Sequence, residues 1–184
     1  MSTSVTICPV GLIDEKIIEH IGKSIEARCG LECRVSQGVE NPRYAYDEKR
    51  QQYNSKLILK RLLECCPQDS RRLIGITHVD LYVPILKYVF GLAQIEGPCS
   101  IISIHRLRPQ FYEQPSDNNL LLNRVEKTAV HELGHTLGLT HCRERRCVMY
   151  SSTRIEDTDS KQPDFCPTCF ELFKWNLDKL GTSV

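Results

Sequence analysis

The stretch HELGHTLGLTH occupies residues 131–141, and Cys142 follows it directly. On a helix, His131 and His135 are four residues apart, so both imidazoles leave the same face and can bind one zinc ion. Glu132 would stand beside that ion without ligating it, close enough to take a proton from a water molecule. The stretch therefore predicts a zinc site with a carboxylate base next to it.

The second half of the stretch supplies a third ligand. Gly138 can adopt a positive φ at low cost, so the helix can end in a tight turn, after which the chain offers the imidazole of His141. Three protein ligands leave the fourth tetrahedral position open for water, which is typical of a catalytic zinc rather than a structural one. The alternative is a chance match on an ordinary amphipathic helix. The added glycine and third histidine count against it, because they stand at the spacing of an extended zinc-binding motif.

The residues before this motif predict the helix that carries it. Between positions 119 and 137, apolar residues recur every three or four positions and form one core-facing stripe: Leu122, Val125, Ala129, Leu133 and Leu137. His131 and His135 each lie two residues from a stripe position, a rotation of about 200°, so we expect both to face away from the core. Ser116, Asp117 and Asn118 are the candidate N-caps.

Four cysteines form a second pattern, C-x4-C-x18-C-x2-C: Cys142, Cys147, Cys166 and Cys169. Four thiolates suffice for a closed, structural zinc site. Pro167 suits the first turn of a helix that runs to about Leu180, and a helix N-terminus lowers thiol pKa values. Two disulfides or four free thiols are the alternatives, and the cytoplasmic location expected below, which is a reducing compartment, favours zinc.

His141 and Cys142 are adjacent in the chain, which bears on the number of metal ions. Neighbouring side chains diverge, so a single ion would not take both. The simplest arrangement has two zinc ions, one bound by His141 and the other by Cys142. The cysteine-bound ion would then hold the backbone that positions His141.

These motifs together resemble the archaemetzincin family of zinc metallopeptidases. The resemblance covers residues 131–169: the extended histidine motif, the Cys-x-Met element that ends at Met149, and the Cys-x-x-Cys pair. Weaker similarity lies upstream, in residues 75–82 and 90–93. The interval from Met149 to Cys166 is one residue shorter than in the family pattern, within a loop rich in Ser, Thr and Asp.

The resemblance implies a role for each site residue. It implies a catalytic zinc on His131, His135 and His141, with Glu132 as general base, and a structural zinc on Cys142, Cys147, Cys166 and Cys169. Met149 would be the Met-turn methionine beneath the histidines. The substrate, a peptide or protein, would lie extended along an edge strand formed by residues 88–95.

The remaining pattern predicts an α/β (α+β) fold. Strands are expected at residues 4–8, 31–35, 73–79, 88–95 and 100–106, and helices at residues 13–29 and 52–66, before the active-site helix. This order, with right-handed crossovers, predicts a metzincin-like mixed twisted sheet backed by helices. We expect a single domain over residues 1–184. Residues 1–138 would be an upper part with the sheet and active-site helix. Residues 139–184 would be a lower part with the Met-turn and a helical segment stapled by zinc.

Composition narrows the function classes. The net charge of +1 gives no broad basic surface, so we expect no nucleic-acid partner, and no segment has transmembrane length. Residues 1–10 lack the features of a signal peptide, so we expect a cytoplasmic location. Of the ten cysteines, six lie outside the cluster and are predicted to be buried: Cys8, Cys29, Cys33, Cys65, Cys66 and Cys99. The oligomeric state has no signal in the sequence.

We therefore interpret the chain as a zinc-dependent metallopeptidase that hydrolyses peptide bonds. The alternative is a zinc-containing module that binds peptides with little or no turnover, against which Glu132 argues because a binder needs no base. Tyr112 and Tyr150 are candidate donors to the oxyanion of the transition state.

Overall fold

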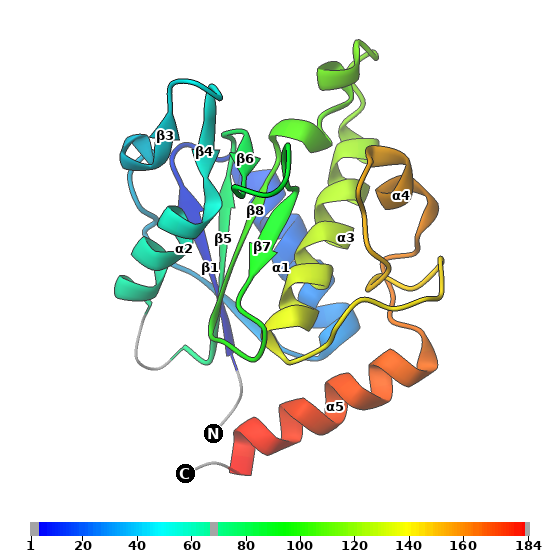
Figure 1. Ribbon diagram of the computed structural model, residues 1–184. Helices are drawn as coiled ribbons and strands as arrows, with labels where there is room; N and C mark the ends of the chain where they lie inside the picture. Colours follow the sequence, from blue (N-terminus) through cyan, green and yellow to red (C-terminus); the bar gives the residue numbers. More distant parts are fainter. Residues whose placement is uncertain (1–3, 67–69, 183–184) are drawn as a thin grey trace.

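Five strands form the main sheet of the computed structural model, which describes residues 4–66 and 70–182 (Figure 1). Their order across the sheet is β2-β1-β5-β8-β7. The strands that run parallel are β1 (Ser4–Val10), β2 (Glu32–Val35), β5 (Arg72–Thr77) and β8 (Cys99–Ser103). β7 (Gly91–Ala93) pairs antiparallel with β8 and forms one edge. The mixed, largely parallel sheet predicted from the sequence is confirmed.

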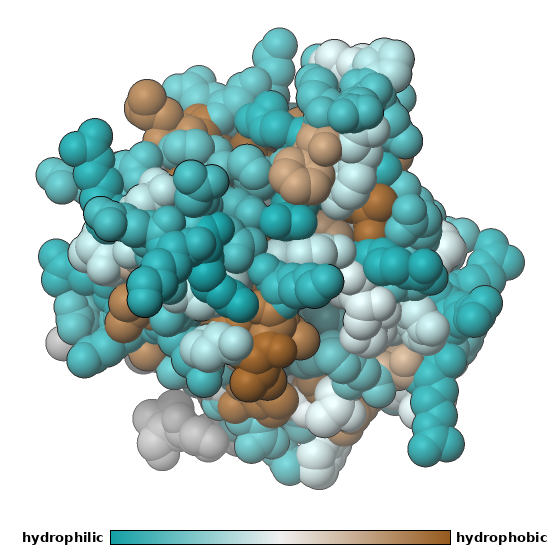
Figure 2. All heavy atoms as spheres, turned by 45° about the horizontal axis from the view of Figure 1, so that its top comes forward, coloured by the Kyte–Doolittle hydropathy of each residue, from teal (hydrophilic) through white to brown (hydrophobic). Residues whose placement is uncertain are grey.

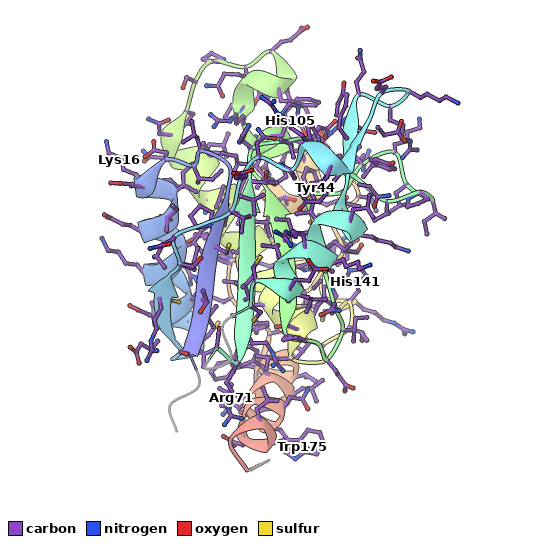
Figure 3. The ribbon with its side chains drawn as sticks, turned by 90° about the vertical axis from the view of Figure 1, so that its left-hand side faces the viewer. Lys16, Tyr44, Arg71, His105, His141 and Trp175 are labelled. Atoms are coloured by element: carbon purple, nitrogen blue, oxygen red, sulfur yellow. The ribbon has the colours of Figure 1, made fainter. Side chains whose placement is uncertain are left out.

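Helices cover both faces of this sheet. The helices of these layers are α1 (Glu15–Cys29), α2 (Ser55–Glu64) and α3 (Asn118–Thr136). α1 and α3 share one hydrophobic core with the sheet and α2 packs on the opposite face, as the side view shows for α1 and α2 (Figure 3). Alternation along β1 serves both cores, because Val5 and Ile7 face α1 and α3 whereas Cys8 and Val10 face α2.

The start of α2 differs from the prediction. A second, smaller sheet contains β3 (Tyr46–Asp47), β4 (Gln52–Asn54) and β6 (Leu81–Tyr82). The helix expected at residues 52–66 therefore begins only at Ser55, and its first three expected residues form β4. The Asn54 side chain accepts a hydrogen bond from the Lys56 N–H and caps the helix there. Short 3-10 turns are η1 (Arg43–Ala45), η2 (His105–Leu107) and η3 (Pro109–Tyr112).

Beyond α3, the chain forms an irregular segment over residues 137–166, which we call the lower segment. It contains α4 (Ile155–Ser160) and leads into α5 (Pro167–Thr182), which lies beneath the rest of the molecule (Figure 1). Arg71, just before β5, donates a hydrogen bond to the Leu180 carbonyl and so ties α5 to the sheet. The division into upper and lower parts at residue 138 stays a prediction.

An ion pair with a buried arginine fixes the lower segment against α3. Arg124 is 2% exposed, and its guanidinium donates two hydrogen bonds of 2.7 Å to the carboxylate of Asp159. Nearby, Lys127 donates to the carbonyl of Thr158 at 3.2 Å. Because Arg124 and Lys127 are buried, moving α4 away from α3 would leave their buried charges without these partners, at high cost.

The surface and the remaining cysteines complete the description. Cys8, Cys29 and Cys99 are buried as predicted. The prediction is wrong for Cys65, which is exposed at the end of α2, and Cys33 and Cys66 are only half-buried. The face drawn in Figure 2 is mostly hydrophilic, with hydrophobic residues in separate patches. Within residues 4–66 and 70–182, none of the helices is long and apolar enough to cross a bilayer. Residues 1–3, part of the stretch 1–10 considered for a signal peptide, lie outside the described part.

Candidate metal and catalytic site

α3 carries the first half of the site, and both of its ends are set by the sequence. Asp117 is the N-cap, since its carboxylate accepts a hydrogen bond from the Leu120 N–H. At the other end, Gly138 has a φ of 84°, as predicted. Its N–H donates to the His135 carbonyl at 3.0 Å, and the chain then turns and leads to His141. In the side view His141 lies on the side away from Lys16 and α1 (Figure 3).

The three histidines meet at one point. Their ligating nitrogens all lie within 4.8 Å of one another, and the Nε2 atoms of His131 and His135 are 3.1 Å apart. The Nδ1 atom of His131 lies 2.8 Å from the Val148 carbonyl, and that of His135 lies 2.7 Å from the Leu139 carbonyl. Because each Nδ1–H donates to a carbonyl, each Nε2 directs a lone pair at its neighbour, an arrangement that a cation between them would stabilise. This donor set fits zinc.

The surroundings of the histidines differ from the prediction that both face away from the core. Every residue from 124 to 134 is buried, and His131 is 7% exposed. His131 does leave the stripe that faces the sheet, but the lower segment covers it. Burial lowers the pKa of His131 well below its usual range, and it lowers the pKa values of His135 and His141 as well. The imidazoles are therefore held neutral, which is the form that binds a metal.

Glu132 lies in a cavity of about 410 Å³ that His131 and His141 also line. Its side chain is 6% exposed, and burial raises the pKa of its carboxyl to about 8, although the charge of Lys161 opposes this rise. The backbone of β7 approaches it closely, because a Cβ atom added to Gly91 would lie 2.6 Å from Glu132 Oε1. The carboxylate is thus held between the three histidines and the edge strand.

Met149 lies fully buried beneath the histidines. A Cβ atom added to Gly134, which stands between His131 and His135 on α3, would lie 2.5 Å from Met149 Sδ. The methionine thus fills the space that the missing side chain leaves. The carbonyl of the preceding residue, Val148, holds His131.

The four cysteines come together as a second group. Their Sγ atoms lie within 4.8 Å of one another: Cys142, Cys147, Cys166 and Cys169. Cys142 Sγ and Cys166 Sγ are 3.8 Å apart, too far for the disulfide bond that was an alternative. The Met149 N–H and the Cys166 N–H both donate to Cys147 Sγ, at 3.4 and 3.3 Å. Such N–H···S bonds stabilise thiolates, so this donor set fits a closed zinc site.

Sequence reasoning missed Lys161, which the structure places at the cavity. Lys161 is 3% exposed, and its Nζ atom lies 3.4 Å from His131 Nδ1 and donates to the Tyr150 carbonyl at 3.1 Å. Burial lowers the pKa of its ammonium to about 8, and the carboxylate of Glu132 opposes that shift. The sequence offered no signal, since Lys161 reaches the cavity only through the path of the lower segment.

The two tyrosines named as oxyanion donors do not line the cavity. The Tyr112 hydroxyl donates instead to the Arg106 carbonyl at 2.9 Å, and only the Tyr150 carbonyl faces Lys161. A different tyrosine does line the cavity: the Tyr88 hydroxyl donates to the Thr153 carbonyl at 2.9 Å and links the approach to β7 with the lower segment.

Known proteins share this chain's sequence over most of its length. The model for Peptidase family M54 matches residues 20–175. An archaemetzincin of Methanocaldococcus jannaschii is 39% identical over 171 residues, which cover 93% of this chain and 93% of that protein. An archaemetzincin of Thermococcus kodakarensis is 36% identical over 180 residues, which cover 95% of this chain and 97% of that one.

Solved structures share the fold. The crystal structure of an archaemetzincin from Methanopyrus kandleri superposes with a TM-score of 0.81 at 33% identity and covers 95% of this chain and 96% of that one. That of an archaemetzincin from Archaeoglobus fulgidus, complexed with malonate, has a TM-score of 0.80 at 31% identity and covers 92% and 99% of the two chains. The similarity thus extends over the sheet, α3 and the lower segment alike.

Proposed function

The chain belongs to peptidase family M54, which makes it a zinc metallopeptidase that acts on peptides or proteins, and we propose that Glu132 is its general base. The resemblance to the archaemetzincins drawn from the sequence is thereby confirmed, and the family favours an enzyme over a peptide-binding module. The observation that supports the role of Glu132 is its position: a buried carboxylate in the cavity lined by His131 and His141.

Two groups of residues would hold metal. His131, His135 and His141 would bind the catalytic zinc, because their ligating nitrogens converge and main-chain carbonyls fix the Nδ1 positions of His131 and His135. The four cysteines of the second group would bind a structural zinc. A zinc ion on the histidines supplies Lewis acidity, which lowers the pKa of a water molecule and polarises a carbonyl group.

Glu132 would move the proton. Its carboxylate accepts the proton of the attacking water molecule and then donates it to the amine that leaves when the peptide bond breaks. The substrate would lie extended along β7, whose outer edge is free of a neighbouring strand in the main sheet and can pair with a peptide main chain. Gly91 of β7 brings that backbone against Glu132, so a peptide paired with β7 would have its scissile bond beside the base.

A peptide library tests the activity. Zinc-loaded protein is incubated with a mixed library, and the products are identified by mass spectrometry. We expect cleavage at defined bonds that stops on addition of a chelator and returns with zinc. Absence of cleavage throughout a broad library, with both metal sites filled, would contradict the proposal.

The close approach at Gly91 leads to a prediction. Gly91→Ala would force a methyl group against the Glu132 carboxylate and displace it, so we expect kcat/KM for peptide hydrolysis to fall by about 10²-fold. Gly22→Ala is the matched control, since a Cβ there has ordinary contacts of 3.6 and 3.7 Å. Kinetics and melting curves of both variants provide the measurement. Full activity in Gly91→Ala would show that the position of Glu132 is not critical.

The two metal sites should differ in how they release zinc. The histidine site opens to a cavity and keeps one position free, whereas four cysteines close the other site. We therefore expect two zinc ions per chain, of which a chelator removes the histidine-bound ion first and the cysteine-bound ion only as the fold is lost. Metal analysis along a chelator titration measures this. A single ion, or simultaneous loss of both, would contradict the assignment.

A further inference from the structure

The cavity holds polar side chains that the hydrolysis mechanism does not use. Lys161, Ser152 and Thr158 of the lower segment all line it, together with Glu132. Lys161 is 3% exposed and Thr158 is 1% exposed. They belong to one stretch of chain, since Thr158 precedes Lys161 by three residues and the Tyr150 carbonyl, two residues before Ser152, accepts from Lys161. The lower segment thus brings an ammonium and two hydroxyls to the same wall.

The hydrogen-bonding capacity of these three groups is largely unused within the described residues. The Lys161 ammonium donates to one carbonyl, that of Tyr150. The Nδ1 atom of His131 lies 3.4 Å from the ammonium. When His131 binds metal through Nε2, its Nδ1 carries a proton and donates to the Val148 carbonyl, so Nδ1 cannot also accept from Lys161. Within the described residues, no carboxylate lies within ion-pair distance of Lys161. In the same part of the chain, the buried Ser152 Oγ and Thr158 Oγ1 atoms have no hydrogen-bond partner.

Unpartnered buried donors of this kind are costly in a folded protein. An ammonium with one acceptor and hydroxyls with none lose hydration without recovering it in full. Two sources could satisfy them: ordered water, or an anionic group that enters with a ligand. A carboxylate matches the set best, because its two oxygens accept several hydrogen bonds and its charge complements the ammonium.

We propose that Lys161, Thr158 and Ser152 form a subsite for a carboxylate of the substrate. The enzyme then prefers peptides that place an acidic side chain, or the C-terminal carboxylate, at one fixed position relative to the cleaved bond. This inference rests on the proposed peptidase function of the same cavity.

The charges facing the cavity agree with this preference. Glu132 alone would repel a second carboxylate, but the ammonium of Lys161 offsets its charge. The zinc ion that the family carries adds two positive charges, and the histidines that would hold it are neutral. Lys87, at the rim of the cavity, adds a further cation. The cavity is therefore positive overall and attracts an anion.

Matched peptides test the subsite. A cleavable peptide is made with Glu or its uncharged analogue Gln at each position in turn, and each version is made with a free or an amidated C-terminus. We expect wild type to cleave the Glu peptide about tenfold faster at one position, a magnitude typical of a charge-assisted hydrogen bond. If the terminus is the source of the carboxylate, the free acid will be preferred over the amide instead. Equal rates for every pair would overturn the inference.

Two variants and a control test which residues cause the preference for the Glu peptide. Lys161→Met should cleave Glu and Gln peptides at equal rates, and Thr158→Val should lower the preference in part. Lys87→Met, at the exposed rim of the same cavity, should keep the preference, because it removes a charge without removing the subsite. Zinc content and melting curves verify that each variant is folded. A preference that survives in both Lys161→Met and Thr158→Val would assign it to other residues.

A binding measurement distinguishes failure of this inference from failure of the peptidase proposal. Zinc-loaded Glu132→Gln protein is titrated with the same peptides in a calorimeter, which requires no turnover. We expect the Glu peptide to bind about tenfold more tightly than the Gln peptide. If nothing is cleaved but this ratio is found, the peptidase proposal fails and the subsite stands. If peptides are cleaved but bind with equal affinity, only the subsite fails and water satisfies these groups.

Discussion

Replacing Glu132 by Gln is expected to lower peptide hydrolysis by about 10²- to 10⁴-fold while both zinc ions stay bound. Glutamine keeps the shape of the side chain between α3 and Gly91 but cannot take a proton from water. The carboxylate is not one of the proposed metal ligands, so its loss leaves the metal site intact. Hydrolysis rates, zinc content and melting temperature, measured on the same preparations, provide the test.

His131→Ala gives the contrast to this variant. Removing a ligand should release the histidine-bound zinc, so activity and metal are lost together, whereas Glu132→Gln loses activity alone. Another result would change the interpretation of the whole site. If wild type cleaves nothing in a broad library, yet binds peptides as tightly as Glu132→Gln does, the chain acts as a peptide-binding module.

Replacing Cys169 by Ser is expected to abolish stable folding rather than catalysis. The apparent free energy of zinc binding to such sites is about 10 kcal/mol, which is as large as the stability of a whole domain. We expect the variant to bind one zinc ion fewer and to be largely unfolded at room temperature, while any folded fraction stays active per molecule. Circular dichroism and metal analysis measure both quantities.

Cys65→Ser is the matched control for this prediction. Cys65 is exposed at the end of α2 and belongs to neither metal group, so its replacement should leave zinc content and melting temperature unchanged. If Cys169→Ser melts like wild type, the cysteine group does not staple the lower segment, and the second zinc ion has no structural role.

Local signals in the sequence predicted much of this molecule. The helix N-cap among residues 116–118, the positive φ of Gly138 and the first strand at residues 4–8 follow from rules that act over a few residues, and the structure agrees with each. The groups formed by three histidines and four cysteines were also found from spacing, because metal-binding motifs fix distances along the chain.

What the sequence could not predict depends on contacts between distant segments. The apolar stripe of α3 indicated one buried face, but the lower segment covers the other face and buries His131. Lys161 reaches the cavity only because α4 is fixed to α3 by the Arg124–Asp159 ion pair, a contact between residues 35 positions apart. The same limit explains why Tyr112 and Tyr150 were wrong candidates: aromatic side chains near a motif in sequence need not line its cavity.

Residues 147–149 connect the two metal groups and favour one order of zinc binding. Cys147 contributes to the cysteine group, the Val148 carbonyl orients His131, and Met149 fills the hollow at Gly134. A newly made chain that binds zinc on its cysteines, as we propose, would thereby set the acceptor for His131 before a second ion arrives. If zinc met the histidines first, the Val148 carbonyl would not yet be held in position to orient His131. In a cell where zinc is scarce, we therefore expect partly loaded molecules to be folded and inactive, a reserve that further zinc switches on.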